Sequence, residues 1–495
     1  MTTNSPLEVL GLGPDHLCTR DQPLQIQLQL PANQESSVGI CDPLGRSLLE
    51  KRYTPARTEQ YLLHIDPSTL PRISGQHRIY LLTGNRSWWT PLRFQENTPS
   101  LLHLRYTTWF DLQDPSIGPL RNFQVRIGLP DSTGPIQQIN NLWASRMPAH
   151  VEHPPPGDRS WIVHPRRWHE GPLRFRTDVD LTLRTVRFDL DEIARESPYL
   201  SRPPRPRTPL PSEEGIESQA PLILEAANNL GPPETSTLAL LRSAHQFVRD
   251  QIRYVVQPEE YGALKGLQEG KGDCTEMAAL LAALCRARGI PARVNVGRFA
   301  SSPDLHAVTE ISLSGFWIPI DVTHSEPGEW PGFDDPFLVL GRSNWMSRHT
   351  SPQKIQVEYW SPHTANLNFT ERTRLTRIAG GKPPPSARNG LGGPISLGVN
   401  LECPEIELHW TSERKVLSLN IENRISPFLG TALITLGDEG LRVLRVINIE
   451  MTRGQRLSFS LELPIQQLGP FEARDLKVLL FESSGHQLLE RSPIS

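Results

Sequence analysis

The segment GKGDCTEMAALLAALCRARGIPAR, residues 270–293, constrains the fold most, because it predicts one long buried helix that begins at a thiol. Asp273 is a favourable N-cap residue, and Glu276 three positions later completes the pattern of a capping box. Helical spacing places Cys274 at the edge of an apolar stripe, and alanines cover much of the remaining surface. Gly289 ends the helix. We therefore expect a central helix that packs on several sides.

The position of Cys274 at a helix start has a chemical consequence. Unpaired N–H groups and the helix dipole lower the pKa of a thiol there, whereas the charge of Asp273 works in the opposite direction. The alternative is a small buried hydrophobe, which is what most free cysteines are. Cys285 lies three turns further along the same face and is interpreted as a core residue. A catalytic role for Cys274 therefore requires a basic partner elsewhere in the chain.

Composition limits the class of protein. A length of 495 residues suggests three or four domains. Proline accounts for 47 residues, nearly twice the usual share of about 5%, which favours β-rich modules joined by linkers. The net charge of −3 gives no reason to expect a nucleic-acid or membrane partner. Five cysteines without CxxC spacing indicate neither a zinc knuckle nor a disulfide framework.

The sequence gives no indication of export or membrane insertion. The start of the chain lacks a basic segment followed by an apolar run of signal length. No stretch reaches the 18 apolar residues that a membrane-spanning helix needs. We therefore expect a cytoplasmic protein, and the sequence does not predict its oligomeric state.

Strand patterns and Pro-rich or Gly-rich stretches predict the domain organisation. LQIQLQL (24–30) alternates strictly and is typical of a half-buried strand, and several short strands near the C-terminus indicate a β-sandwich. Helical patterns precede the cysteine helix at 216–230 and 236–252. We expect an N-terminal β domain (1–98), a β-rich domain (99–200), a Pro-rich linker (201–215), a catalytic core (216–378), a Gly/Pro linker (379–394) and a C-terminal β-sandwich (395–495).

A predicted hairpin downstream of the helix supplies the basic partner. The strands HAVTEISL (306–313) and FWIPIDVT (316–323) are separated only by Ser314-Gly315, which favours a tight turn. This pairing places His306 and Asp321 on the same face as diagonal neighbours, within reach of each other. A one-residue change in the loop would place them on opposite faces.

Together, Cys274, His306 and Asp321 form the set that a nucleophilic cysteine needs. The imidazole takes the thiol proton, and the carboxylate fixes its tautomer and stabilises the imidazolium. Each residue alone is weak evidence, since a single histidine at a strand start is more often structural. Their order and the hairpin pairing favour the catalytic interpretation.

These same residues carry a family resemblance. GKGDCTEMAALLAALCRARGIPARVNVGRF, HAVTEI and WIPIDVT resemble the core of the transglutaminase-like superfamily, over about residues 270–323. The resemblance implies an α+β fold with a papain-like core of the bacterial type, flanked by β-rich domains. It also implies Cys274 as nucleophile, His306 as general base and acid, and Asp321 as the residue that orients His306. The chain departs from the family at Val308, where an aromatic residue is common, which concerns substrate packing more than the triad.

An oxyanion site has two candidate donors. The backbone N–H of Cys274 is one, because it lies at the helix start. Gln268 is the other, since papain-like thiol hydrolases use a glutamine ahead of the cysteine; its alternative role is that of an exposed loop residue. No metal or other cofactor is expected. His324 near Asp321 lacks accompanying ligand spacing, and no EF-hand loop is present.

The predicted function is that of a thiol acyl-transfer enzyme acting on a protein or peptide substrate. Cys274 would cleave a peptide or carboxamide bond through a thioester, which water resolves in a peptidase or amidase. A lysine amine resolves it instead in a cross-linking transglutaminase, the first alternative. The second alternative is a non-catalytic scaffold of β modules that binds a protein partner.

Overall fold

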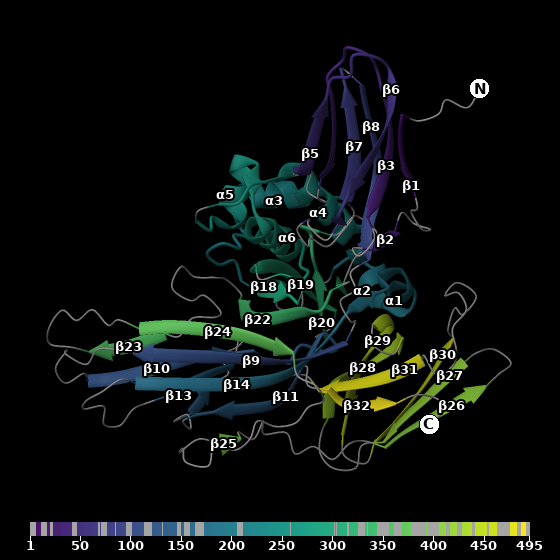
Figure 1. Ribbon diagram of the computed structural model, residues 1–495. Helices are drawn as coiled ribbons and strands as arrows, with labels where there is room; N and C mark the ends of the chain where they lie inside the picture. The colour runs from purple at the N-terminus through teal and green to yellow at the C-terminus, as the bar shows by residue number, and fades with distance from the viewer. Residues whose placement is uncertain are drawn as a thin grey trace.

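The structure is a computed structural model in which the chain is β-rich. It describes residues 6–10, 17–19, 23–41, 47–67, 70, 77–84, 86–95, 101–112, 121–130, 132–145, 150–152, 159–163, 173–204, 211–257, 259–300, 302, 304–313, 316–324, 332–333, 335–343, 356–360, 369–377, 393–394, 405–411, 416–422, 428–437, 441–452, 455–462, 476–482 and 487–491. Figure 1 shows a group of helices between the N-terminal strands and the strands β9 (Leu101–Leu112) and β14 (Leu173–Arg184). The last strands of the chain lie beside β9 and β14.

The N-terminal region consists of two sheets that share one apolar core. In β3 (Leu24–Leu30) the four apolar side chains are buried, while Gln25 and Gln29 are exposed. The half-buried strand predicted from the alternating sequence is therefore confirmed. One sheet has the order β1 (Leu7–Leu10), β3, β6 (Glu59–Ile65), and the other β2 (Leu17–Thr19), β8 (Arg86–Gln95), β7 (His77–Thr83), β4 (Ser36–Cys41), β5 (Ser47–Tyr53).

A second pair of sheets combines strands from before and after the helices. β9 (Leu101–Leu112) pairs along its whole length with β14 (Leu173–Arg184), and β24 (Phe369–Arg377) pairs with its other edge. The chain therefore returns to this region after the helices. The sheets have the orders β24, β9, β14, β11 (Gln137–Ala144), β25 (Gly393–Pro394) and β12 (His150–Glu152), β13 (Arg159–Val163), β10 (Arg121–Leu129), β23 (Gln356–Trp360).

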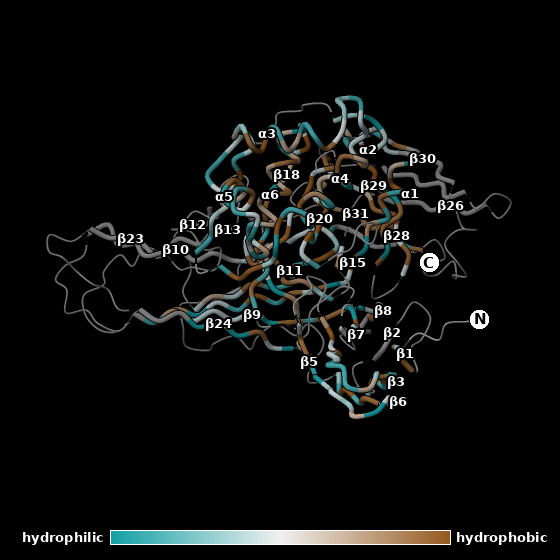
Figure 2. Tube along the Cα trace, turned by 90° about the horizontal axis from the view of Figure 1, so that it is seen from above, coloured by the Kyte–Doolittle hydropathy of each residue, from teal (hydrophilic) through white to brown (hydrophobic). Residues whose placement is uncertain are grey.

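The cysteine helix, α6 (Cys274–Ala287), lies at the centre of the largest apolar core, as its sequence predicts. Every residue from Thr275 to Arg286 is buried, and the run of hydrophobic residues along α6 can be followed in Figure 2. It contacts the helices α3 (Pro221–Asn228), α4 (Thr237–Gln251) and α5 (Gly262–Glu269). It also contacts the strands β17 (Lys271–Gly272), β18 (Ala292–Phe299) and β19 (His306–Leu313).

The buried Arg286 near the end of α6 ties this helix to the predicted Pro-rich linker. Its guanidinium donates to the carbonyl oxygens of Ala292 and Pro211, each at 2.7 Å, and to Glu213 at 2.6 Å. These acceptors offset the cost of burying the charge. Residues 205–210 of the predicted linker and all of the second one except β25 lie outside the described residues.

The central sheet has the order β20 (Phe316–Ile320), β19 (His306–Leu313), β18 (Ala292–Phe299), β22 (Phe337–Ser343). Leu313 pairs with Phe316 and Thr309 with Ile320, so the predicted hairpin register is confirmed, although its two loop residues lie outside the described part. The predicted second strand is too long, because β20 ends one residue before Asp321. The Asp321 carboxylate accepts the N–H groups of Thr323 and His324, and these bonds hold a turn in place of extended backbone.

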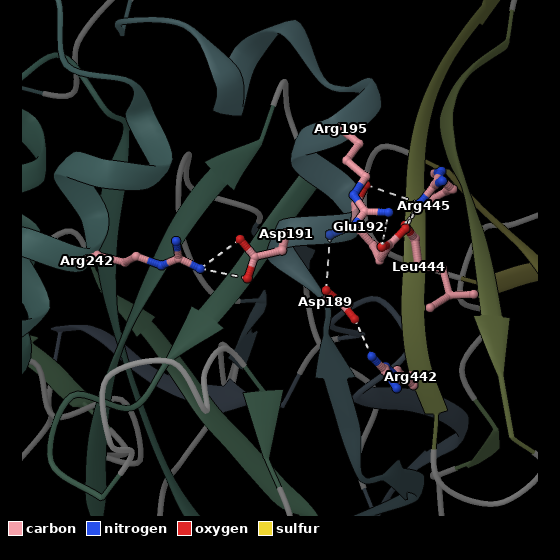
Figure 3. Close-up of polar contacts among 8 residues, drawn as sticks. All are labelled: Asp189, Asp191, Glu192, Arg195, Arg242, Arg442, Leu444 and Arg445. Atoms are coloured by element: carbon pink, nitrogen blue, oxygen red, sulfur yellow. Dashed lines mark hydrogen bonds and ion pairs between the residues drawn. The ribbon is translucent and has the colours of Figure 1, made fainter. Parts of the chain in front are cut away.

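The C-terminal strands join the segment that leads into the helices. β15 (Val186–Phe188) pairs in parallel with β29 (Leu441–Met451). Beside this pairing, Glu192 of α1 (Leu190–Glu196) and Arg445 of β29 form a buried ion pair at 3.3 Å (Figure 3). One sheet has the order β21 (Gly332–Phe333), β15, β29, β28 (Phe428–Leu436), β31 (Leu476–Glu482), β32 (Gln487–Arg491), and another β26 (Glu405–Thr411), β27 (Val416–Glu422), β30 (Arg456–Glu462).

Candidate active site

The start of α6 is held by a complete capping box, as the sequence predicts. The Asp273 carboxylate accepts the N–H of Thr275 at 2.9 Å, and Glu276 accepts the N–H of Asp273 at 2.9 Å. Just before it, β17 (Lys271–Gly272) pairs in parallel with β16 (Arg253–Tyr254). The backbone on both sides of Cys274 is therefore fixed, which sets the position of the thiol.

The glycine in Gly-Asp-Cys makes room for the buried Glu276. A Cβ atom on Gly272 would lie 2.5 Å from the Cβ of Glu276, so no larger residue fits without a shift. The Glu276 carboxylate also accepts the N–H of Tyr261 at 2.8 Å. Burial raises the pKa of Glu276, and the backbone donors Tyr261 and Asp273 act against this rise. Glu276 thus links the loop before α5 to the start of the thiol helix.

Cys274 and Cys285 differ in their surroundings. Cys274 is half-buried at the helix start, whereas Cys285 is 1% exposed in the apolar core. Burial raises the pKa of the Cys285 thiol to about 12, and the nearby Arg286 lowers it only in part. Among the hydrogen bonds of the described residues, none uses the backbone N–H of Cys274. This group is therefore available as a donor to a developing oxyanion.

His306 and Asp321 lie together, as the hairpin register predicts. The His306 Nε2 atom is 3.0 Å from Asp321 Oδ2, and both side chains are almost fully buried. The strand that carries His306 is joined to the thiol helix, because the Thr309 hydroxyl donates to the carbonyl of Ala278 at 2.8 Å. The Cys274 thiol lies close enough to His306 to help raise the pKa of the imidazole. The three candidate residues therefore form one connected set.

The charges of this set stabilise each other. Burial works to lower the pKa of His306, but the charge and hydrogen bond of Asp321, together with Cys274, outweigh it and raise the pKa to about 10. Burial would likewise raise the pKa of Asp321, yet His306 and His324 hold it well below its ordinary value. The arrangement thus favours an imidazolium beside a carboxylate at neutral pH.

A second histidine, His324, joins the site from the turn after β20. Its Nδ1 atom is 3.0 Å from Asp321 Oδ2, and its ring centroid is 4.4 Å from that of His306. Phe299 packs against both imidazoles, with centroid distances of 5.4 and 5.9 Å. From the sequence, His324 is a candidate only for metal binding. The spacing Asp-x-x-His at a strand end is the signal that could have identified its contact with Asp321.

The ligand atoms of His306, Asp321 and His324 lie within 4.8 Å of one another, a spacing that a metal ion could bridge. Both imidazoles already use the atoms concerned in hydrogen bonds to the same carboxylate oxygen. These bonds account for the cluster without an ion, so we interpret it as a hydrogen-bonded network.

The α4 helix supports the turn that carries Asp321. The Arg249 guanidinium lies 3.4 Å from the carbonyl oxygens of Val322 and Thr323. His245 on the same helix is fully buried, and burial together with the charge of Arg249 lowers its pKa to about 3, against the opposing effect of Asp321. His245 is therefore neutral at ordinary pH.

Gln268, the second candidate oxyanion donor, lies near the C-terminal end of α5 and is exposed. Among the contacts of the described residues, none joins it to Cys274 or His306. Gln268 is therefore a solvent-exposed residue, as in the alternative interpretation, and its position does not support a role as an oxyanion donor.

Comparison with known proteins relates the central part of the chain to one family. Residues 225–322 match the model of the transglutaminase-like superfamily. Within the described residues, no helix is long and apolar enough to cross a membrane. No curated protein matches the sequence.

Three solved structures are similar at low identity. A proposed cysteine protease from Cytophaga hutchinsonii is 14% identical, with a TM-score of 0.37 over 59% of this chain and 97% of the other. A proposed protease from Parabacteroides distasonis is 12% identical, with a TM-score of 0.17 over 61% and 64%. Red sea bream transglutaminase is 11% identical, with a TM-score of 0.19 over 95% and 79%. Similarities this low carry no argument about activity.

Proposed function

Starting from the transglutaminase-like match of residues 225–322, we propose that the chain is a thiol acyl-transfer enzyme that cleaves peptide or carboxamide bonds. The observation that carries this proposal is the contact of His306 with Asp321 at 3.0 Å, and the effect of Cys274 on the pKa of His306 supports it. Within this proposal, Cys274 is the nucleophile, His306 the general base and acid, and Asp321 the residue that orients His306.

The reaction proceeds in two balanced steps. The Cys274 sulfur bonds to the carbonyl carbon after its proton has passed to His306 Nδ1, the nitrogen opposite the one that contacts Asp321, so that His306 is already the imidazolium that its raised pKa favours. The C–N bond then breaks, His306 gives the proton to the departing amine or ammonia, and a thioester remains. Water then attacks the thioester and loses a proton to His306. As the C–S bond breaks, His306 returns that proton to the sulfur and the acid leaves.

The helix start supplies the charge stabilisation that these steps need. Negative charge develops on the carbonyl oxygen during each attack, and a backbone N–H aimed at that oxygen stabilises it strongly in a partly dry site. The N–H of Cys274 is placed at the positive end of α6 for this role. We assign no oxyanion role to Gln268.

The proposal includes the finer organisation of the chain. A papain-like α+β core at residues 216–378 would carry the reaction, with β-rich domains at 1–98 and 99–200 and a β-sandwich at 395–495. Residues 356–360 and 369–377, placed with this core, pair with the strands β10 and β9 of the second β region. That pairing gives the second β region a direct hydrogen-bonded link to the core.

The test is amide cleavage by the full chain, followed by mass spectrometry on a mixed peptide pool that contains glutamine residues. We expect cleavage or ammonia release in the wild type, and none in Cys274→Ala or His306→Ala. Cys41→Ala is the matched control, because Cys41 is also half-buried and lies far away in sequence. Adding a fluorescent primary amine distinguishes the two fates of the thioester: incorporation indicates transamidation, and its absence indicates hydrolysis. Undiminished turnover in Cys274→Ala would refute the proposal.

A further inference from the structure

Two imidazoles share one oxygen of the Asp321 carboxylate. His306 Nε2 and His324 Nδ1 each lie 3.0 Å from Oδ2. The other oxygen, Oδ1, accepts the backbone N–H groups of Thr323 at 3.1 Å and His324 at 3.2 Å. Two oxygens offer about four acceptor sites, and these four bonds match that number. His324 provides two of the four donors just described, one from its ring and one from its backbone.

The shared oxygen determines which ring nitrogens carry protons. An ionised carboxylate only accepts hydrogen bonds, so both nitrogens that face Oδ2 must be protonated. His306 therefore carries its proton on Nε2, which leaves Nδ1 for the thiol. His324 carries its proton on Nδ1. Each hydrogen bond to the carboxylate draws on its negative charge. Because two imidazoles bind the same oxygen, the carboxylate stabilises each of them less than it would stabilise one alone.

His324 is held in this position by its neighbours. Its ring is 4.4 Å from that of His306, and Phe299 lies edge-on against it at 5.9 Å. Among the described residues, the charged and titratable groups near this pair include Asp321 itself, Cys274, and Arg249 and His245 from α4. His245 is neutral at ordinary pH, so Arg249 is the fixed positive charge on that side.

We propose that His324 is a positioning residue, which holds Asp321 and takes up part of its charge, so that Asp321 binds the His306 imidazolium less tightly. This inference rests on the proposed function. In acyl transfer, His306 must release its Nδ1 proton to the departing amine as the C–N bond breaks, while its Nε2 proton stays with Asp321. An imidazolium paired with an undivided carboxylate releases that proton less readily. His324 therefore favours the acid role of His306.

Two substitutions separate the donor from the ring. His324→Phe keeps an aromatic ring but has no donor, whereas His324→Asn places an amide N–H near the position of Nδ1. In the Phe variant we expect the pKa of His306, followed by NMR of its ring, to rise by about one unit. We expect kcat for amide cleavage to fall about tenfold with little change in KM, the effect of losing one hydrogen bond to a charged group. The Asn variant should stay close to the wild type in both measurements.

The inference can also be tested on the wild-type protein, so the test does not depend on whether the His324→Phe variant folds. Nitrogen-15 NMR of the histidine rings should show His324 protonated at Nδ1 and His306 protonated at Nε2. An unprotonated His324 Nδ1, an unchanged His306 pKa in the Phe variant, or an Asn variant that behaves like Phe would overturn the inference. The NMR results need no substrate. If no form of the protein cleaves an amide, the proposed function fails while His324 is still tested.

Discussion

His306 Nε2 and Asp321 Oδ2 are 3.0 Å apart although 15 residues separate them in the chain. The hairpin β19–β20 brings them together, because its register pairs Thr309 with Ile320, the residue directly before Asp321. Asp321 itself lies just past the end of β20, where its carboxylate holds a turn through two backbone N–H groups. The residue that fixes the imidazole is thus fixed by its own backbone.

Cys274 should react much faster with iodoacetamide near pH 7 than Cys285. Cys274 is half-buried at a helix N-terminus beside His306, whereas burial raises the pKa of Cys285 to about 12 and blocks access. Mass spectrometry of labelled peptides from the folded protein gives both rates. Labelling at Cys274 should slow in His306→Ala. Equal labelling of the two cysteines would mean that Cys274 is only structural.

Asp321→Asn should slow amide cleavage by a factor of roughly 10² or more without removing the thiol. The neutral amide no longer stabilises the His306 imidazolium, so the pKa of His306 should fall. Its side chain can also present an N–H where His306 needs an acceptor, which reverses the tautomer. The measurements are kcat and the alkylation rate of Cys274. Cleavage at the wild-type rate would exclude Asp321 from the mechanism.

The stability provided by His306 should decrease at high pH. The pKa of an unfolded histidine is about 6.5, and that of His306 in the folded chain is about 10. Folding therefore favours its protonated form, and this contribution is complete below about pH 6.5 and is lost as the pH rises toward about 10. We expect His306→Gln to lower the free energy of unfolding more at pH 6 than at pH 9.5.

Chemical denaturation of both proteins at these two pH values checks this expectation. Asp321 does not titrate in this range, because its pKa is held well below its ordinary value. The buried His245, with a pKa of about 3, contributes stability above pH 6.5 and affects both proteins alike. The same loss at both pH values would show that the imidazolium–carboxylate pair does not stabilise the fold.

Gly272→Ala should destabilise the chain by about 1–3 kcal/mol, the usual cost of overpacking. The added Cβ would lie 2.5 Å from the Cβ of the fully buried Glu276. Gly266→Ala is the graded control, because its Cβ would lie 3.0 Å from the same atom and needs a smaller shift. Denaturation curves should show a larger loss of unfolding free energy in Gly272→Ala than in Gly266→Ala. A Gly272→Ala variant as stable as the wild type would contradict the packing argument.

Arg445→Met should destabilise the joint between α1 and β29 by about 1–3 kcal/mol, because the buried Glu192 carboxylate loses this charged partner and keeps the one on its own helix, Arg195 at 2.8 Å. Arg242→Met removes a second ion pair of α1, the exposed contact with Asp191 at 2.7 Å (Figure 3). Exposed pairs contribute at most about 1 kcal/mol, so this variant is the matched control. If thermal unfolding shows the same loss of stability in both variants, burial of the Arg445–Glu192 pair does not increase its contribution to stability.

The sequence by itself determined the local features of the site. The capping box and the apolar spacing predicted where α6 begins and that it is central, because both depend on contacts within a few residues. The two-residue separation of the strands predicted the hairpin register, and with it the contact of His306 with Asp321. These features are decided by backbone geometry over short distances in the chain.

Only the tertiary structure decided the rest. The pairing of β24 with β9 and the packing of Phe299 against His306 and His324 depend on how distant segments pack. The strength of the charges at the site depends in the same way on burial, which removes water from His306 and Asp321 and leaves each as the other's main partner. Local sequence patterns carry no information about burial by distant residues, so they place the catalytic groups but do not set their protonation.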